Sequence, residues 1–101
     1  MEKRRREIVV DEMDKHVHRT CDRLYKILLS AESWDINIAG NTMYVDIVSN
    51  RRDIDIAIAD AINGFDKVGY HKYKDDIALV IEDTRVRDLL NCIIKADQNR
   101  F

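Results

Sequence analysis

The stretch Trp34-Asp-Ile-Asn-Ile-Ala-Gly-Asn-Thr-Met-Tyr-Val-Asp-Ile-Val-Ser49 decides the fold, because it predicts a β-hairpin in a single register. If Gly40 and Asn41 form a two-residue turn, each apolar residue on one face lies opposite another one. These pairs are Trp34 with Ile47, Ile36 with Val45, and Ile38 with Met43. The opposite face carries polar residues, so the hairpin predicts an antiparallel sheet with one apolar and one polar surface.

A long helix is predicted before the hairpin, over residues 3–31. Its apolar stripe, at spacings of three and four residues, comprises Val9, Met13, Val17, Cys21, Leu24, Leu28 and Ala31. Such a helix would be about 40 Å long, which is large beside a domain of this size. It is therefore expected either to cover the sheet, for instance over its polar face, or to pack on a second copy in a homodimer.

A second helix is predicted after the hairpin, although residues 53–60 also alternate as a strand would. The helical stripe comprises Ile54, Ala57, Ile58, Ala61, Ile62 and Phe65. We prefer the helix because this stripe continues to Phe65 and alanines are frequent. Ser49 or Asn50 is the expected cap at its start, and Asn63-Gly64 is the expected stop.

A second hairpin and a third helix complete the chain. With Lys74-Asp75 as the turn, the hairpin over residues 68–82 pairs Val68 with Ile81 and Tyr70 with Leu79, although a longer loop is an open alternative. Asp83 or Thr84 is the expected cap of the third helix. Its apolar stripe comprises Val86, Leu89, Leu90, Ile93 and Ile94.

The element order is thus α-ββα-ββα, in a single domain spanning residues 1–101. The two hairpin-helix units, 34–64 and 67–98, lie about 34 residues apart, and Val45, Ile47 and Arg51 correspond to Leu79, Ile81 and Arg85 at that offset. We expect an α+β fold in which two related units share a roughly four-stranded antiparallel sheet with helices packed on it.

Charge is abundant and unevenly distributed. Charged residues make up 36% of the chain, and residues 32–83 hold eleven Asp/Glu against five Lys/Arg, whereas both ends are mildly basic. An acidic body favours basic partner surfaces. The charged N-terminus and the lack of a long apolar run predict a cytoplasmic protein that does not enter a membrane. Cys21 and Cys92 are expected to be reduced, and a disulfide between them is the alternative.

No motif indicates catalysis. The chain has no Gly-rich phosphate loop, no H-E-x-x-H and no G-x-S-x-G, so we expect no enzyme and no cofactor. His16, His18, Cys21 and Asp22 are the one cluster of metal-ligand types. A single helix could direct only two or three of them to one ion, whereas zinc needs three or four. No metal is therefore assigned, and a small metal-dependent protein is a third functional alternative.

The polar face of the sheet is the predicted partner-binding surface. Its candidate residues are Asp35, Asn37, Tyr44, Asp46, His71 and Tyr73. Acids beside tyrosines suit an arginine-bearing protein, since tyrosine is enriched at interfaces. We expect a non-enzymatic protein-binding module, an inhibitor or adaptor of the phage or mobile-element antagonist type, whose partner has a basic surface and could itself be a nucleic-acid enzyme.

The principal alternative is a dimeric nucleic-acid-binding protein. Its phosphate contacts would come from basic residues at the N-terminus and at the starts of the second and third helices. These are Lys3, Arg4, Arg5, Arg6, Arg51, Arg52, Arg85 and Arg87.

Overall fold

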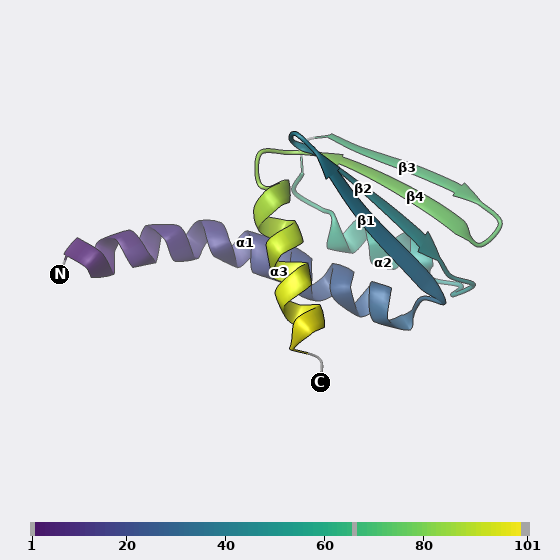
Figure 1. Ribbon diagram of the computed structural model, residues 1–101, viewed down its shortest axis with the longest axis horizontal. Coiled ribbons are helices and arrows are strands. Elements are labelled where there is room, and N and C mark those ends of the chain that lie inside the picture. The colour runs from purple at the N-terminus through teal and green to yellow at the C-terminus, as the bar shows by residue number, and fades with distance from the viewer. Residues whose placement is uncertain (1, 66, 100–101) are drawn as a thin grey trace.

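The computed structural model describes the backbone of residues 2–65 and 67–99, and the side chains of these ranges from Lys15 onward. The elements are α1 (Glu2–Ser30), β1 (Ser33–Ala39), β2 (Thr42–Val48), α2 (Ile54–Ala61), β3 (Lys67–Tyr73), β4 (Asp76–Glu82) and α3 (Val86–Gln98). The predicted order and the α+β fold with a four-stranded antiparallel sheet are confirmed (Figure 1). Within the described ranges, no helix is both long and apolar enough to cross a membrane.

The sheet has the strand order β1-β2-β4-β3, with every neighbouring pair antiparallel. Both predicted hairpin registers are confirmed: Ile36 lies opposite Val45, and Tyr70 lies opposite Leu79. Each hairpin turns through a residue with positive φ, Gly40 at 60° and Lys74 at 55°. The second turn therefore uses the predicted Lys74-Asp75 pair without glycine, and lysine carries the cost of a left-handed conformation.

The two hairpins are related by an approximate two-fold axis. Each strand of the second hairpin begins 34 residues after its counterpart, Lys67 after Ser33 and Asp76 after Thr42. The central strands β2 and β4 pair so that Val45 lies opposite Leu79, its own counterpart at that offset. The axis therefore passes beside this pair, and the spacing seen in the sequence corresponds to a symmetric arrangement of the strands.

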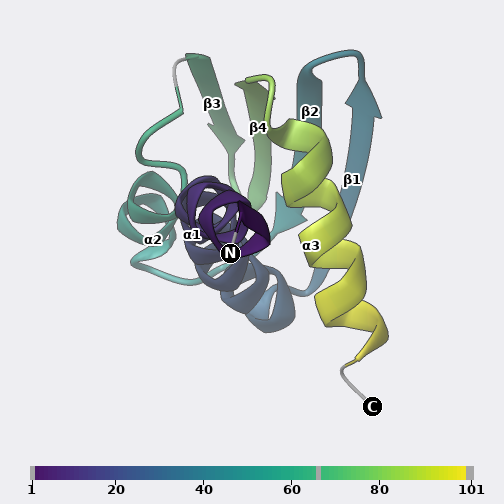
Figure 2. The ribbon, with the colours of Figure 1, turned by 90° about the vertical axis from the view of Figure 1, so that its left-hand side faces the viewer.

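All three helices pack on one face of the sheet. Figure 2 shows α1 between α2 on the β3 side and α3 on the β1 side. The core between the layers is fully apolar at its centre, where the following side chains are at most 1% exposed: Leu24, Leu28, Met43, Val45, Ile47, Ile54, Ile58, Leu79, Ile81, Val86, Leu89 and Ile93. Burying each side chain of this size contributes roughly 1.5–3 kcal/mol before the entropy of ordering is counted.

The position of α1 corrects two expectations. It packs on the apolar face, so the alternative in which it covers the polar face is wrong. Its backbone spans Glu2–Ser30, close to the predicted 3–31, and its described side chains are those of residues 15–30. Val17, Cys21, Leu24 and Leu28 of its stripe are buried within the chain and form no free dimer seam. The side chains of Val9 and Met13 lie outside the described residues.

The helix ends differ from the predicted caps. α2 is a helix, as preferred for residues 53–60, but Asp53 occupies its N-cap position without a side-chain cap bond. Ser49 instead accepts a hydrogen bond from the Arg51 backbone N–H (3.3 Å), because a turn separates the strand from the helix. α2 ends at Ala61, so Phe65 is buried beyond it. Gly64, at φ 102°, supplies the left-handed conformation that was expected there.

The third helix begins one residue later than its predicted caps allow. Arg85, rather than Asp83 or Thr84, occupies the N-cap position of α3. The Asp83 carboxylate accepts the Arg85 backbone N–H (2.9 Å), so it orders the turn before the helix instead of capping the helix itself. Val86, Leu89 and Ile93 are buried as predicted, whereas Ile94 is 43% exposed.

Candidate functional site: the outer face of the sheet

The outer face is the side of the sheet that lies opposite the helices. Because side chains alternate along each strand, it carries every second residue. In strand order these are Ser33, Asp35, Asn37 and Ala39 of β1; Thr42, Tyr44, Asp46 and Val48 of β2; Asp76, Ala78, Val80 and Glu82 of β4; and Lys67, Gly69, His71 and Tyr73 of β3. All six residues predicted to bind a partner therefore lie on this face.

Two aspartates face each other on the outer face. Asp35 lies directly opposite Asp46, and the same row continues through Ala78 to His71. The Asn37 side-chain amide donates to Asp35 Oδ2 (3.0 Å), while neither aspartate forms an ion pair with any described lysine or arginine. Like charges that lie directly opposite each other on neighbouring strands destabilise a sheet, so this pair lowers the folding stability of the chain.

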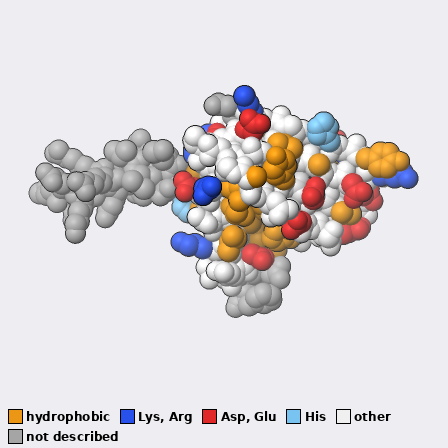
Figure 3. Space-filling model, turned by 45° about the horizontal axis from the view of Figure 1, so that its top comes forward, with side chains coloured by type: hydrophobic (Ala, Val, Ile, Leu, Met, Phe, Trp, Pro, Cys, Tyr) orange, Lys and Arg blue, Asp and Glu red, His pale blue; other side chains and the backbone are white. Residues whose placement is uncertain are grey.

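A shallow hollow of about 510 Å³ lies at the end of the outer face that is formed by the β3–β4 turn. Asp46, Val48, Asp76, His71 and Tyr73 contribute to its lining. The Tyr73 side chain is 72% exposed and offers a large amphipathic surface. In Figure 3, acidic side chains gather toward the right-hand end of the described surface, where this turn lies. The hollow thus combines carboxylates with an exposed aromatic ring.

Asp76 is a candidate residue of the outer face that the sequence analysis did not name. Asp76 was not among the six residues predicted for this face, but it belongs to β4 and lies opposite Tyr73. It is also a neighbour of Val48 across the central strand pair. The predicted second-hairpin register already implied this placement, since it puts residue 76 on the same face as residues 78 and 80.

The other end of the outer face is closer to charge balance. Lys67 pairs with Glu82 (3.8 Å), and these two residues lie opposite each other on β3 and β4. The acids without a described cation are therefore concentrated in the half that holds Asp35, Asp46 and Asp76. We call this half of the outer face the acidic half.

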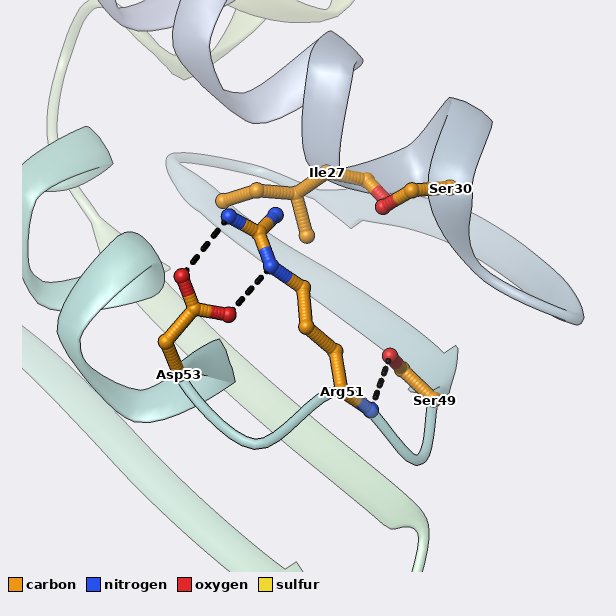
Figure 4. A network of polar contacts seen from close by, with 5 residues as sticks. All are labelled: Ile27, Ser30, Ser49, Arg51 and Asp53. Carbon is orange, nitrogen blue, oxygen red and sulfur yellow. Dashed lines mark hydrogen bonds and ion pairs between the residues drawn. The ribbon is translucent and has the colours of Figure 1, made fainter.

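The arginines proposed to bind nucleic acid do not form one surface. Arg51 and Arg52 follow β2, whereas Arg85 and Arg87 follow β4, and these strands are antiparallel, so the two pairs lie at opposite ends of the sheet. Arg51 donates hydrogen bonds from both Nε and Nη2 to the Asp53 carboxylate, and the distance from Nη2 to Oδ2 is 3.0 Å (Figure 4). Lys3, Arg4, Arg5 and Arg6 have side chains outside the described residues.

Arg85 is more deeply engaged than Arg51. Its Nε and Nη2 both donate to Asp83 at 2.9 Å, and Nη2 also donates to the Gly64 carbonyl at 3.2 Å. The guanidinium lies 5.0 Å from the centre of the Phe65 ring, within cation–π range. These donated hydrogen bonds hold the pKa of Asp83 below its usual value. Arg85 therefore anchors the start of α3, and this role competes with a phosphate contact.

The histidine and cysteine cluster resolves into a packed contact between α1 and α3. His18 Nδ1 lies 3.8 Å from Cys92 Sγ, and the two free cysteines are close neighbours. Burial, and then the adjacent Cys92, raise the pKa of Cys21 to about 12. The thiol of Cys21 is therefore protonated and a poor nucleophile near neutral pH. Among the described side chains, no group of three or more His, Cys, Asp or Glu is placed to hold a metal ion.

The outer face can therefore bind cationic groups through carboxylates and can bury apolar surface against tyrosine, but it assembles no nucleophile with a base. Comparison with protein-family models, with curated proteins and with solved structures finds no match for this chain.

Proposed function

We propose that this protein is a non-enzymatic protein-binding module whose outer face docks on a basic site of another protein. The observation that carries the proposal is the opposed pair Asp35 and Asp46, which lies on the face that none of the three helices covers. Such a pair costs folding stability and is relieved when a partner's arginine or lysine lies between the carboxylates. The proposed module acts as an inhibitor or adaptor by occupying that basic site.

The surroundings of the pair support a protein partner over a nucleic acid. Tyr44 and Tyr73 lie on the same face and are 44% and 72% exposed, and exposed tyrosines are common anchors of protein interfaces. Aromatic rings can also stack on bases, but a phosphate backbone would be repelled by the acidic half. Of the described arginines at the sheet ends, Arg51 is paired with Asp53 and Arg85 with Asp83.

Affinity capture from a lysate of the native cell tests the proposal when it compares charge-reversed variants. The bait is used as it is and as Asp35→Lys with Asp46→Lys, after nuclease treatment and at low and high salt. The matched control is Asp22→Lys with Asp88→Lys, which makes the same change in net charge on exposed positions of the helical layer. We expect one protein to be retained by the unmodified chain and by the control, and lost with the outer-face variant.

Two outcomes contradict the proposal. Equal loss with both double variants would mean that net charge, and not the outer face, drives capture. Retention of nucleic acid that is removed by nuclease or salt would favour the dimeric nucleic-acid-binding alternative. The same variants should be checked for folding by circular dichroism, which separates a lost surface from a lost structure.

A further inference from the structure

The two edges of the sheet are protected to different degrees. An edge strand exposes unpaired N–H and C=O groups, and proteins discourage pairing there with lysines, prolines, bulges or inward-pointing charges. β3 has such protection: it carries Lys67, His71 and Lys72, and Lys72 points to the helix side, where it pairs with Asp55 of α2 (3.7 Å). β1 reads Ser-Trp-Asp-Ile-Asn-Ile-Ala and has neither a basic residue nor a proline.

In the part of the chain that the structure describes, no backbone hydrogen bond reaches the apolar positions of β1 from its open side. Beyond the strand ends, Asp83 N–H donates to the Asn41 carbonyl (2.9 Å) and Ser49 N–H donates to the Asp75 carbonyl (3.0 Å). The backbone groups of odd-numbered residues in β2 therefore form their hydrogen bonds with β4. Those of even-numbered residues in β2 form them with β1, where their partners are the odd-numbered residues. It follows that Trp34, Ile36 and Ile38 direct their N–H and C=O groups away from β2, to the open edge.

An apolar patch lies beside this edge on the helix side. Trp34, Ile36 and Ile38 of β1 and Leu90 of α3 are only partly buried against the core, and Ile94 of α3 is 43% exposed. α3 is the helix nearest to β1 (Figure 2). The open backbone edge and the partly exposed apolar side chains are therefore continuous, which is the composition expected of an interface core.

We infer that a second copy of this chain pairs along β1, edge to edge and antiparallel, so that two sheets join into one. A two-fold axis at Ile36 places Trp34 opposite Ile38 of the second copy and Asp35 opposite its Asn37. Apolar residues then meet apolar residues, and each carboxylate meets an amide. An axis at Asp35 would instead oppose two aspartates across the edge, which is unfavourable.

The amide–carboxylate match is already used within one strand, where Asn37 donates to Asp35 at 3.0 Å. In the joined sheet, the second amide proton of Asn37 faces Asp35 of the second copy. The joined sheet also makes the two acidic halves neighbours on one surface. The inferred pairing rests on the backbone and side chains of β1 and does not depend on which partner the outer face binds.

Asn37 provides a test that leaves the core untouched, because its side chain is exposed on the outer face. Light scattering and sedimentation, from low micromolar to millimolar protein, should give a mass approaching twice the 11.9 kDa of one chain. Asn37→Asp creates two opposed acid pairs per dimer and should weaken dimerisation by about 2- to 30-fold, whereas Asn37→Lys should strengthen it. His71, the counterpart of Asn37 on β3 at the 34-residue offset, gives the controls His71→Asp and His71→Lys, which should leave dimerisation unchanged.

Cross-linking tests the register. Asp35→Cys and Asn37→Cys chains, mixed and oxidised with a small-molecule disulfide, should give a covalent dimer that neither variant gives alone, since residue 35 faces residue 37 of the other copy. A monomer at every concentration would overturn the inference. So would a dimer that the Asn37 variants leave unchanged, or one in which the His71 variants act as strongly as the Asn37 variants.

Discussion

The two Arg–Asp pairs at the sheet ends give a sharp test of how burial controls the strength of an ion pair. Asp83 and Asp53 occupy related corners, but the Asp83 side chain is 6% exposed and that of Asp53 is 57% exposed. Asp83 accepts three hydrogen bonds from Arg85, each of 2.9 Å. We therefore predict that Asp83→Asn is strongly destabilising and that Asp53→Asn has little or no effect.

The expected size follows from those contacts. Hydrogen bonds to charged groups contribute roughly 1.5–3 kcal/mol, and removal of one partner of a buried pair leaves the other charge poorly compensated. Arg85 is 28% exposed, so water partly replaces the carboxylate. We expect Asp83→Asn to lower the free energy of unfolding by about 2–3 kcal/mol, or the Tm by about 10–20 °C. Exposed pairs such as Arg51–Asp53 contribute little, because solvent screens them.

Urea unfolding followed by fluorescence of Trp34, the single tryptophan, measures both variants. The pH dependence adds an independent check. Because Arg85 lowers the pKa of Asp83, the contribution of the pair is complete above the ordinary value of 3.8 and is lost as the pH falls through the lowered pKa. The difference in the free energy of unfolding between Asp83→Asn and the unmodified chain should therefore disappear in strong acid. Equal losses from Asp83→Asn and Asp53→Asn, or a difference independent of pH, would refute the reasoning.

Two further predictions concern the turn after α2 and the outer face. Gly64→Ala should lower the free energy of unfolding by about 2–3 kcal/mol in thermal melts, since its φ is 102° and an added Cβ would lie 2.6 Å from His16 Cε1. Gly40→Ala, with no atom within 4 Å of the added Cβ, should cost only about 1 kcal/mol, and a reversed order would contradict the packing around His16. Asp46→Asn should raise the free energy of unfolding by about 0.2–1 kcal/mol while weakening partner capture, and a loss of stability would show that Asp35 and Asp46 do not repel in the folded chain.

The sequence alone determined the order of the elements and the register of the first hairpin, whereas it left a longer loop open in the second hairpin and a strand open over residues 53–60. Side-chain alternation has a period of two, so a shift of one residue would move Ile36 and Val45 to the wet face and Asp35 and Asp46 into the core. That penalty is local to the hairpin and can be evaluated without the rest of the chain. For the same reason, the six predicted residues of the outer face could be assigned to one surface before the sheet order was known.

The helix ends were less predictable from sequence. Ser49, Asn50 and Thr84 were among the expected N-caps, but Asp53 and Arg85 occupy the N-cap positions, and neither side chain makes a cap hydrogen bond. Capping preferences are worth about 1 kcal/mol, and the burial of Ile54 and Val86 against the sheet outweighs them. The place where a helix begins is thus decided by which residue must reach the core.

Only the tertiary structure decided how the elements combine. The pairing of β2 with β4, the gathering of three helices on one face, and the separation of Arg51 from Arg85 all depend on contacts between residues far apart in the chain. The approach of Cys92 to Cys21 and His18 is of the same kind. Local periodicity states which face of an element is apolar, but it does not state which element that face meets. Sequence therefore predicted the composition of the outer face, whereas the helix packing left that face, and the edge of β1, open.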